Sequence, residues 1–143
     1  MKNILVSKCL LGYPCRYDGK SVPCGDVIGL KDEYNLIPVC PEELGGLETP
    51  RIPAEIIGDK VVRKDGVDIT AEYTMGAKLA LSYALENGCE IAILKSKSPS
   101  CGKDRIYDGT FTGTLTSGYG ITARLLMSKG IHILDESEIY KLK

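Results

Sequence analysis

IAILKSKSPSCGK, the stretch from Ile91 to Lys103, joins a short apolar run to a loop rich in hydroxyl, amine and thiol groups. Its first four residues are apolar and bounded by turn residues, which predicts a strand covered on both faces of a parallel sheet. In open α/β sheets, ligands bind outside the carboxyl ends of the strands. The loop is therefore a candidate site, and it carries Lys95, Ser98, Ser100, Cys101 and Lys103.

Two other predicted strands deliver a cysteine to the same kind of position. In NILVSKCLLG, Cys9 follows a strand over residues 3–8, and in NLIPVCPEELGG, Cys40 follows a strand over residues 36–39. If the three strands are parallel neighbours, Cys9, Cys40 and Cys101 converge at one edge of the sheet.

The rest of the chain contains further predicted helices and strands. They are a short helix over 26–33, a hairpin around Gly58-Asp59, a helix from Thr70 to Asn87, a helix over 121–129, a strand over 131–134 and a last short helix capped by Asp135. Residues 102–120 are rich in glycine and are expected to form a long functional loop. This order predicts a three-layer α/β/α, doubly wound, mostly parallel four-stranded sheet of flavodoxin-like or Rossmann-like type, with a small β-hairpin excursion. We expect residues 1–143 to form a single α/β domain.

Composition excludes several classes of protein. The net charge of −1 gives no global field for a long nucleic acid, and no apolar stretch approaches the roughly 20 residues of a membrane span. Neither GxGxxG after the first strand nor GxxxxGK[ST] is present, so a dinucleotide or P-loop site has no support. The N-terminus is too polar for a signal peptide, and we expect a cytoplasmic protein.

Six cysteines are many for a cytoplasmic chain of 143 residues, and they favour ligands or nucleophiles over disulfides. His132, the only histidine, lies inside a predicted strand and is interpreted as structural, as is Cys89 at the start of another strand. Cys15 and Cys24 lie outside strand ends and are either ligands or half-buried thiols. Thiolate sets favour an iron–sulfur cluster or zinc. The spacing alone leaves open a metal site, a thiol-based catalytic site and unrelated cysteines.

Several charged residues have two interpretations. Arg16 and Asp18 bind a ligand or belong to a simple turn, and Arg51 is a solvated charge or an anion anchor. Glu42 and Glu43 follow Cys40 in a first helical turn, where acidic residues are often only partners of the helix dipole. Around a helix the two glutamates would point about 100° apart, so only one of them is expected to face the site.

Four motifs together resemble the thiouracil desulfidase family, which was long catalogued as a domain of unknown function. They are SKCLLGYPCRYDG, PVCPEELGGLETPR, DGVDIT and KSKSPSCG followed by IYDGTFTG, and they occur in the family's order over nearly the whole chain. The resemblance implies a [4Fe-4S] cluster held by Cys9, Cys40 and Cys101, with a fourth iron that takes the substrate sulfur. It also implies that Glu42 and Ser98 take part in catalysis. Cys15 and Cys24 lie outside this ligand pattern, which leaves open an auxiliary role for either.

The activity implied by the resemblance is non-redox hydrolysis of a thiocarbonyl group in a small thiolated nucleobase. Glu42 would act on the attacking water as base and then as acid, and sulfide would stay on the unique iron. Ser98 would relay a proton or hold the tetrahedral intermediate. The residues expected to contact the substrate are Arg16, Asp18, Lys95, Ser100 and Lys103. The alternative is a zinc- or cluster-binding module that carries metal, sulfur or electrons without turnover.

Overall fold

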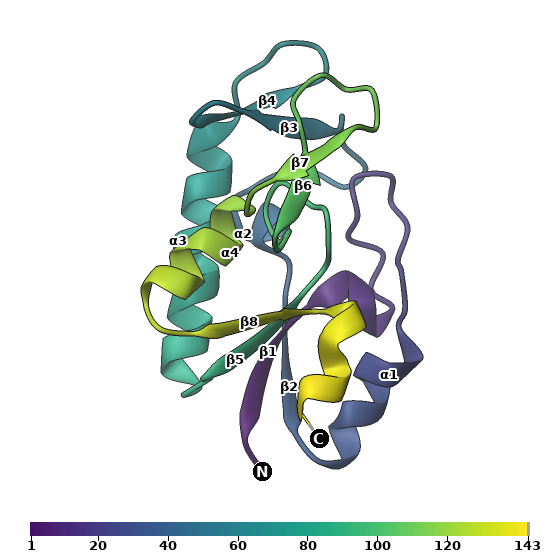
Figure 1. Ribbon diagram of the computed structural model, residues 1–143, viewed down its shortest axis with the longest axis vertical. Helices are drawn as coiled ribbons and strands as arrows, with labels where there is room; N and C mark the ends of the chain where they lie inside the picture. Colours follow the sequence, from purple (N-terminus) through teal and green to yellow (C-terminus); the bar gives the residue numbers. More distant parts are fainter. Residues whose placement is uncertain (143) are drawn as a thin grey trace.

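A computed structural model describes residues 1–142 and places four parallel strands in one sheet (Figure 1). The strands are β1 (Asn3–Ser7), β2 (Asn35–Val39), β5 (Ile91–Leu94) and β8 (His132–Asp135), in the spatial order β2-β1-β5-β8. Every neighbouring pair is parallel, so the predicted four-stranded sheet is confirmed. The carboxyl ends of β2, β1 and β5 are consecutive along one edge.

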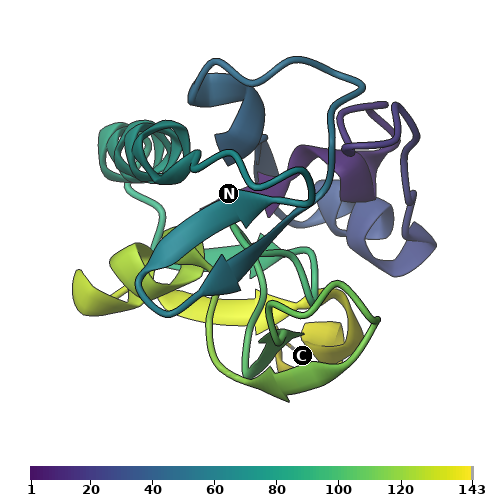
Figure 2. The same cartoon turned by 90° about the horizontal axis from the view of Figure 1, so that it is seen from above.

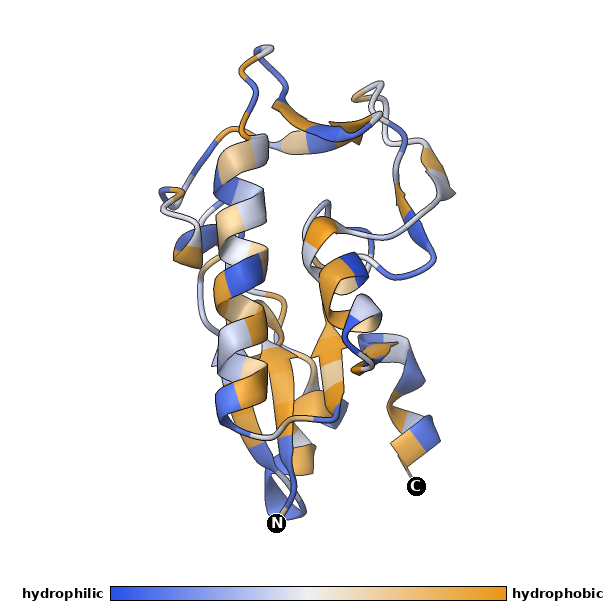
Figure 3. Ribbon diagram, turned by 90° about the vertical axis from the view of Figure 1, so that its left-hand side faces the viewer, coloured by the Kyte–Doolittle hydropathy of each residue, from blue (hydrophilic) through white to orange (hydrophobic). Residues whose placement is uncertain are grey.

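Helices cover both faces of this sheet, which confirms the three-layer arrangement. One layer contains α3 (Thr70–Glu86) and α4 (Ile121–Ser128), and the other contains α1 (Gly25–Ile28), the 3₁₀-helix η2 (Gly29–Asp32) and the 3₁₀-helix η3 (Glu136–Leu142). Figure 3 shows the apolar strands beside α3. Ala92, Ile93 and Leu94 are fully buried, as the apolar run predicted for a strand covered on both faces.

Two small hairpins stand beyond the edge at which the parallel strands end (Figures 1 and 2). The first pairs β3 (Ala54–Ile57) with β4 (Lys60–Arg63), as expected around Gly58. The second pairs β6 (Arg105–Tyr107) with β7 (Leu115–Ser117), inside the segment that the sequence predicted as loop. That prediction was wrong in this part because the strands are only three residues long and β7 is mostly exposed, so no apolar alternation marks them.

The short helix α2 (Pro41–Leu44) follows β2 directly and packs on α3 through two glycines. A Cβ atom on Gly45 would overlap the carbonyl of Glu72, and one on Gly76 would overlap the carbonyl of Pro41. The two backbones can therefore touch only because both positions lack a side chain. A 3₁₀-helix, η1 (Lys8–Leu11), follows β1 in the same way.

Within residues 1–142, none of the helices combines the length and the hydropathy that are needed to span a bilayer.

Candidate active site

A cavity of about 470 Å³ is lined by residues from the carboxyl edge of the sheet and from the two hairpins. The residues that line it include Cys9, Cys15, Cys40, Glu42, Arg51, Tyr73, Lys95, Ser98, Cys101, Tyr107 and Phe111. The three cysteines expected at strand ends therefore do meet in one pocket. Their exposed fractions are 7% for Cys9, 8% for Cys40 and 4% for Cys101, so the cysteines that line the pocket are buried.

Each of these thiols is placed by a short, well-defined segment. Cys9 lies in η1 immediately after β1, and Cys40 is the residue that caps the start of α2. Cys101 is held by Ser98, whose Oγ accepts hydrogen bonds of 3.1 Å from the backbone N–H groups of both Ser100 and Cys101. Ser98 thus shapes the turn that carries Cys101, in addition to any chemical role.

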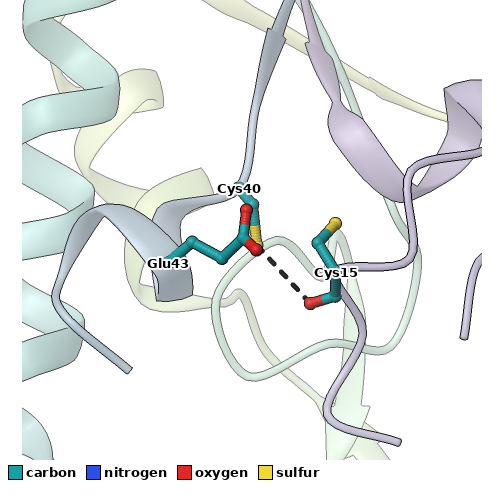
Figure 4. Close-up of side chains that lie close together, drawn as sticks. All are labelled: Cys15, Cys40 and Glu43. Carbon is teal, nitrogen blue, oxygen red and sulfur yellow. Dashed lines mark hydrogen bonds between the residues drawn. The ribbon is translucent and has the colours of Figure 1, made fainter. Parts of the chain in front are cut away.

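Cys15 is a fourth buried thiol in the pocket, with an exposed fraction of 4%. The Cys40 thiol donates to the Cys15 carbonyl oxygen at 3.8 Å, and Cys9, Cys15 and Cys40 line the same pocket. Cys15 Sγ, Cys40 Sγ and a carboxylate oxygen of Glu43 all lie within 4.8 Å of one another (Figure 4). The sequence left the role of Cys15 open, and the structure places it beside Cys40, in the same pocket as all three expected ligands.

Glu42 lines the cavity and Glu43 is not among the lining residues, but the Glu43 carboxylate lies beside the Cys15 and Cys40 thiols. This carboxylate reaches back over Cys40, where it also forms an ion pair of 3.4 Å with Lys8 Nζ. Glu43 can reach these thiols because it has a long side chain with a cationic partner, Lys8, on that side.

The surroundings of Cys15, Cys40 and Cys101 raise the pKa values of these three thiols. The hydrogen bond with the Cys40 thiol lowers the pKa of Cys15, but the contact with Cys9 and burial outweigh it and raise that pKa to about 12. The hydrogen bond with Cys15 and burial raise the pKa of Cys40. Burial and the Glu42 carboxylate raise the pKa of Cys101 to about 12. A bound metal would displace these protons, and four buried thiols are a soft donor set that suits iron–sulfur clusters or zinc.

Glu42 is fixed on the other wall of the pocket by two partners. Arg51 Nη2 donates to Glu42 Oε2 at 2.8 Å, and the Tyr73 hydroxyl donates to the same oxygen at 3.4 Å. Burial lowers the pKa of Arg51, but the Glu42 carboxylate more than compensates and raises it. Burial, followed by the Glu42 charge, raises the pKa of Tyr73 well above its usual value. Arg51 is therefore not a solvated charge, and the anion that it anchors is the Glu42 carboxylate of the same chain.

The backbone of the second hairpin is tied over the pocket by a buried carboxylate. Glu55, in β3, accepts hydrogen bonds at Oε1 from the backbone N–H groups of Gly109 (2.9 Å) and Phe111 (3.2 Å). Phe111 and Tyr107 thereby form part of the lining. Sequence reasoning missed Glu55 because its partners are backbone groups 54 and 56 residues away.

Two of the five residues expected to contact substrate do line the pocket. Arg16 and Lys95 are among the lining residues, although Lys95 Nζ also pairs with Glu136 at 3.0 Å and Arg16 Nη2 lies 3.5 Å from Asp18. Both charges are therefore already partly neutralised within the chain.

The other three are placed elsewhere. Asp18 caps its own turn by accepting from the Lys20 N–H, and the Ser100 hydroxyl is buried against Thr122 Oγ1 at 2.8 Å. Lys103 Nζ is 2.7 Å from Glu138, an ion pair that points it toward η3. Local turn geometry and these partners draw Asp18, Ser100 and Lys103 away from the cavity lining.

The remaining cysteines and the histidine lie away from the pocket. Cys24 caps α1 and is half buried against the core, and Cys89 is buried in the core between the sheet and the α3–α4 layer, as its apolar interpretation predicted. His132 is exposed on the edge strand β8. Neither cysteine is therefore a candidate ligand of this site.

Fold and site together define a class of protein: a doubly wound α/β sheet whose carboxyl edge carries a thiol-lined cavity with an arginine-held carboxylate in its wall. Residues 4–138 match the family model described as 2-thiouracil desulfurase, and the chain belongs to this family. It is 44% identical over 146 residues to the uncharacterized protein YbbK of Bacillus subtilis (strain 168), covering 95% of this chain and 97% of that one. It is also similar to the solved structure of the [4Fe-4S]-dependent thiouracil desulfidase TudS, with a TM-score of 0.94 and 45% identity over 99% of this chain and 95% of that chain.

Proposed function

We propose that this protein is a cytoplasmic [4Fe-4S]-dependent desulfidase that removes sulfur from a small thiolated nucleobase of thiouracil type by non-redox hydrolysis. Family membership and the likeness to TudS support the reaction class. The observation that carries the proposal is the position of Glu42, which Arg51 and Tyr73 hold in the same cavity as the thiols. Six free thiols support a reducing compartment.

Cys9, Cys40 and Cys101 would hold the cluster, since they end three adjacent strands and line one cavity. When bound, the cluster supplies a soft Lewis acid, an iron without a protein thiolate that accepts the thiocarbonyl sulfur leaving as sulfide. The three thiols come from three separate segments, which follow β1, β2 and β5. The polar side chains in the same cavity would then determine where the proton of the attacking water goes.

Glu42 is the group that would move protons. Both of its hydrogen bonds within residues 1–142 end on Oε2, which leaves Oε1 for a water molecule in the cavity. Glu42 would take a proton from this water as it attacks the thiocarbonyl carbon, and would return the proton to the departing group. Ser98 Oγ accepts two backbone hydrogen bonds, so the Ser98 hydroxyl proton remains free to be donated. It would be donated to the water-derived oxygen that becomes bound to the substrate carbon.

The shape of the cavity supports a small, planar substrate. Its volume of about 470 Å³ is within the usual range of small-molecule sites. Tyr107 and Phe111 line the part formed by the second hairpin, where an aromatic face can stack on a base. A long nucleic acid is not expected, because the chain carries a net charge of −1 and both Arg16 and Lys95 have internal acidic partners.

Glu42→Gln and Ser98→Ala are expected to lower thiouracil desulfidation by about 10²–10⁴-fold, the usual effect of losing an acid/base group. The assay measures sulfide and uracil release anaerobically, per bound iron, because Ser98 also supports the turn of Cys101. Glu86→Gln, at an exposed position in α3, is the matched control and should keep wild-type activity.

Wild-type rates in both variants would overturn the roles of Glu42 and Ser98. Failure of the wild type to release sulfide from any thiolated base at full iron loading would instead favour a binding module without turnover.

A further inference from the structure

We propose that Cys15, Cys40 and Glu43, with Cys9 as the fourth ligand, form a second metal site that binds a single zinc-class divalent ion in the protein without a cluster. This ion would compete with the iron–sulfur cluster, because the two ligand sets share Cys9 and Cys40. The single-ion site does not depend on the proposed desulfidase activity. Only the competition experiment described below rests on it.

The spacing of the donors carries this proposal. A single zinc ion holds its ligand atoms at about 2.0–2.3 Å, so two ligands of one ion lie within roughly 4 Å of each other. Cys15 Sγ, Cys40 Sγ and a Glu43 carboxylate oxygen are already within 4.8 Å of one another. The Cys9 thiol lines the same pocket as Cys15 and Cys40 and is the proposed fourth donor, which would move toward the other three when the ion binds. Three thiols and one carboxylate would then complete a tetrahedral shell.

Burial and charge suit such an ion. Cys9, Cys15 and Cys40 are each at most 8% exposed, whereas the Glu43 side chain is 36% exposed and gives the ion a path from solvent. Three thiolates and one carboxylate exceed the charge of a divalent ion by two. Lys8 Nζ, 3.4 Å from Glu43, reduces this excess. The soft sulfur majority favours zinc over magnesium or calcium.

Each ligand set contains residues that the other lacks, so single substitutions can remove one metal site and leave the other. Cys15 and Glu43 belong to the single-ion set alone. Cys101 belongs to the cluster set alone, since it follows β5, two strands away from β2 and Cys40, and lies outside the donor group of Cys15, Cys40 and Glu43. An ion bound through Cys9 and Cys40 would leave Cys101 without its two partner thiols. The ion-bound form is therefore a state in which the cluster cannot assemble.

The test is an anaerobic titration of the protein stripped of iron with Co²⁺, followed by displacement with Zn²⁺. We expect one equivalent of Co²⁺ with thiolate-to-metal charge-transfer absorption, released as Zn²⁺ takes its place. Binding should release a proton from each ligating thiol. Cys15→Ser should weaken the affinity by more than about 100-fold, beyond the 10–100-fold typical of residues that only support a ligand.

Glu43→Gln is a second variant that leaves the buried core intact, and it should also weaken Co²⁺ binding. Cys101→Ser should keep Co²⁺ affinity while losing iron incorporation, and Cys24→Ser is the control for removing a thiol outside the pocket. In the competition experiment, preloading with Zn²⁺ should block iron–sulfur reconstitution of the wild type but not of Cys15→Ser.

Unchanged Co²⁺ affinity in both Cys15→Ser and Glu43→Gln would overturn the single-ion site. Loss of Co²⁺ binding in Cys101→Ser would assign the ion to the cluster ligands instead. A protein that binds Co²⁺ as described but never turns over a thiolated base would overturn the proposed function and leave this site standing.

Discussion

Arg51 holds together three segments of the pocket through one guanidinium group. Nη1 donates to the Glu48 carbonyl and to Thr49 Oγ1, and Nη2 donates to Glu42 and to the Cys15 carbonyl at 3.1 Å. Its side chain is only 9% exposed, so the pair with Glu42 is largely removed from water. Removing one partner of such a pair leaves an uncompensated charge.

Arg51→Met is therefore expected to destabilise the iron-free protein by about 3 kcal/mol, because it leaves the buried Glu42 carboxylate without its cationic partner. In the Arg51→Met/Glu42→Gln double variant the loss should be smaller than the sum of the two single losses, since no buried charge remains unpaired. Urea unfolding of the four proteins measures both effects. Strictly additive losses would contradict a direct ion pair between the two side chains.

The contact between α2 and α3 is what brings the Tyr73 hydroxyl to Glu42. Gly45 and Gly76 let the two helices touch backbone to backbone, and Tyr73 lies one turn before Gly76 on α3. A single side chain at this contact must push α2, and with it Glu42, away from α3. The position of Glu42 thus depends on two residues that have no side chain of their own.

Gly76→Ala should destabilise the protein by about 1–3 kcal/mol, the usual cost of overpacking, although alanine improves helix propensity by about 1 kcal/mol. Thermal unfolding of the iron-free protein measures the change, and desulfidase activity per bound iron reports the displacement of Glu42. Ser82→Ala, at an exposed position in α3, is the control and should be close to neutral. A more stable Gly76→Ala protein would show that α2 can move without loss.

Across the whole molecule, ion pairs join the loop after β5 to the C-terminal helix η3. Lys95 pairs with Glu136 at 3.0 Å, and Lys103 pairs with Glu138 at 2.7 Å. Burial raises the pKa of Glu138, but hydrogen bonds from Lys103 and Lys141 outweigh it and lower the pKa from 4.5 to about 2. The segment that carries Cys101 is therefore tied to the far end of the chain.

Because the folded pKa of Glu138 is lowered, its contribution to stability is present above pH 4.5 and is lost as the pH falls toward 2. Glu138→Gln should cost up to about 1 kcal/mol at pH 7, the upper range for pairs near the surface. The difference from wild type should shrink steadily between these two pH values in urea unfolding of the iron-free protein. A difference that is constant over this range would contradict the ion pair, and Glu86→Gln provides the reference without one.

The sequence by itself determined the sheet and the meeting of Cys9, Cys40 and Cys101. Short apolar runs of three or four residues predict strands of a parallel sheet, and parallel strands bring their carboxyl ends to one edge. The ligand role of these cysteines, the catalytic roles of Glu42 and Ser98, and the single domain over 1–143 stay predictions.

Only the tertiary structure decided the positions of Cys15, Glu43 and Arg51, and showed that Lys103 turns toward η3 rather than into the cavity. The periodicity of apolar residues predicts which face of a helix or strand is buried. It does not predict the directions of these side chains, because they lie in loops or in a single helical turn. Their directions depend on partners that are distant in the sequence, such as Arg51 with the Cys15 carbonyl across 36 residues. Such partners are chosen by packing and by the need to satisfy buried polar groups, which no local pattern records.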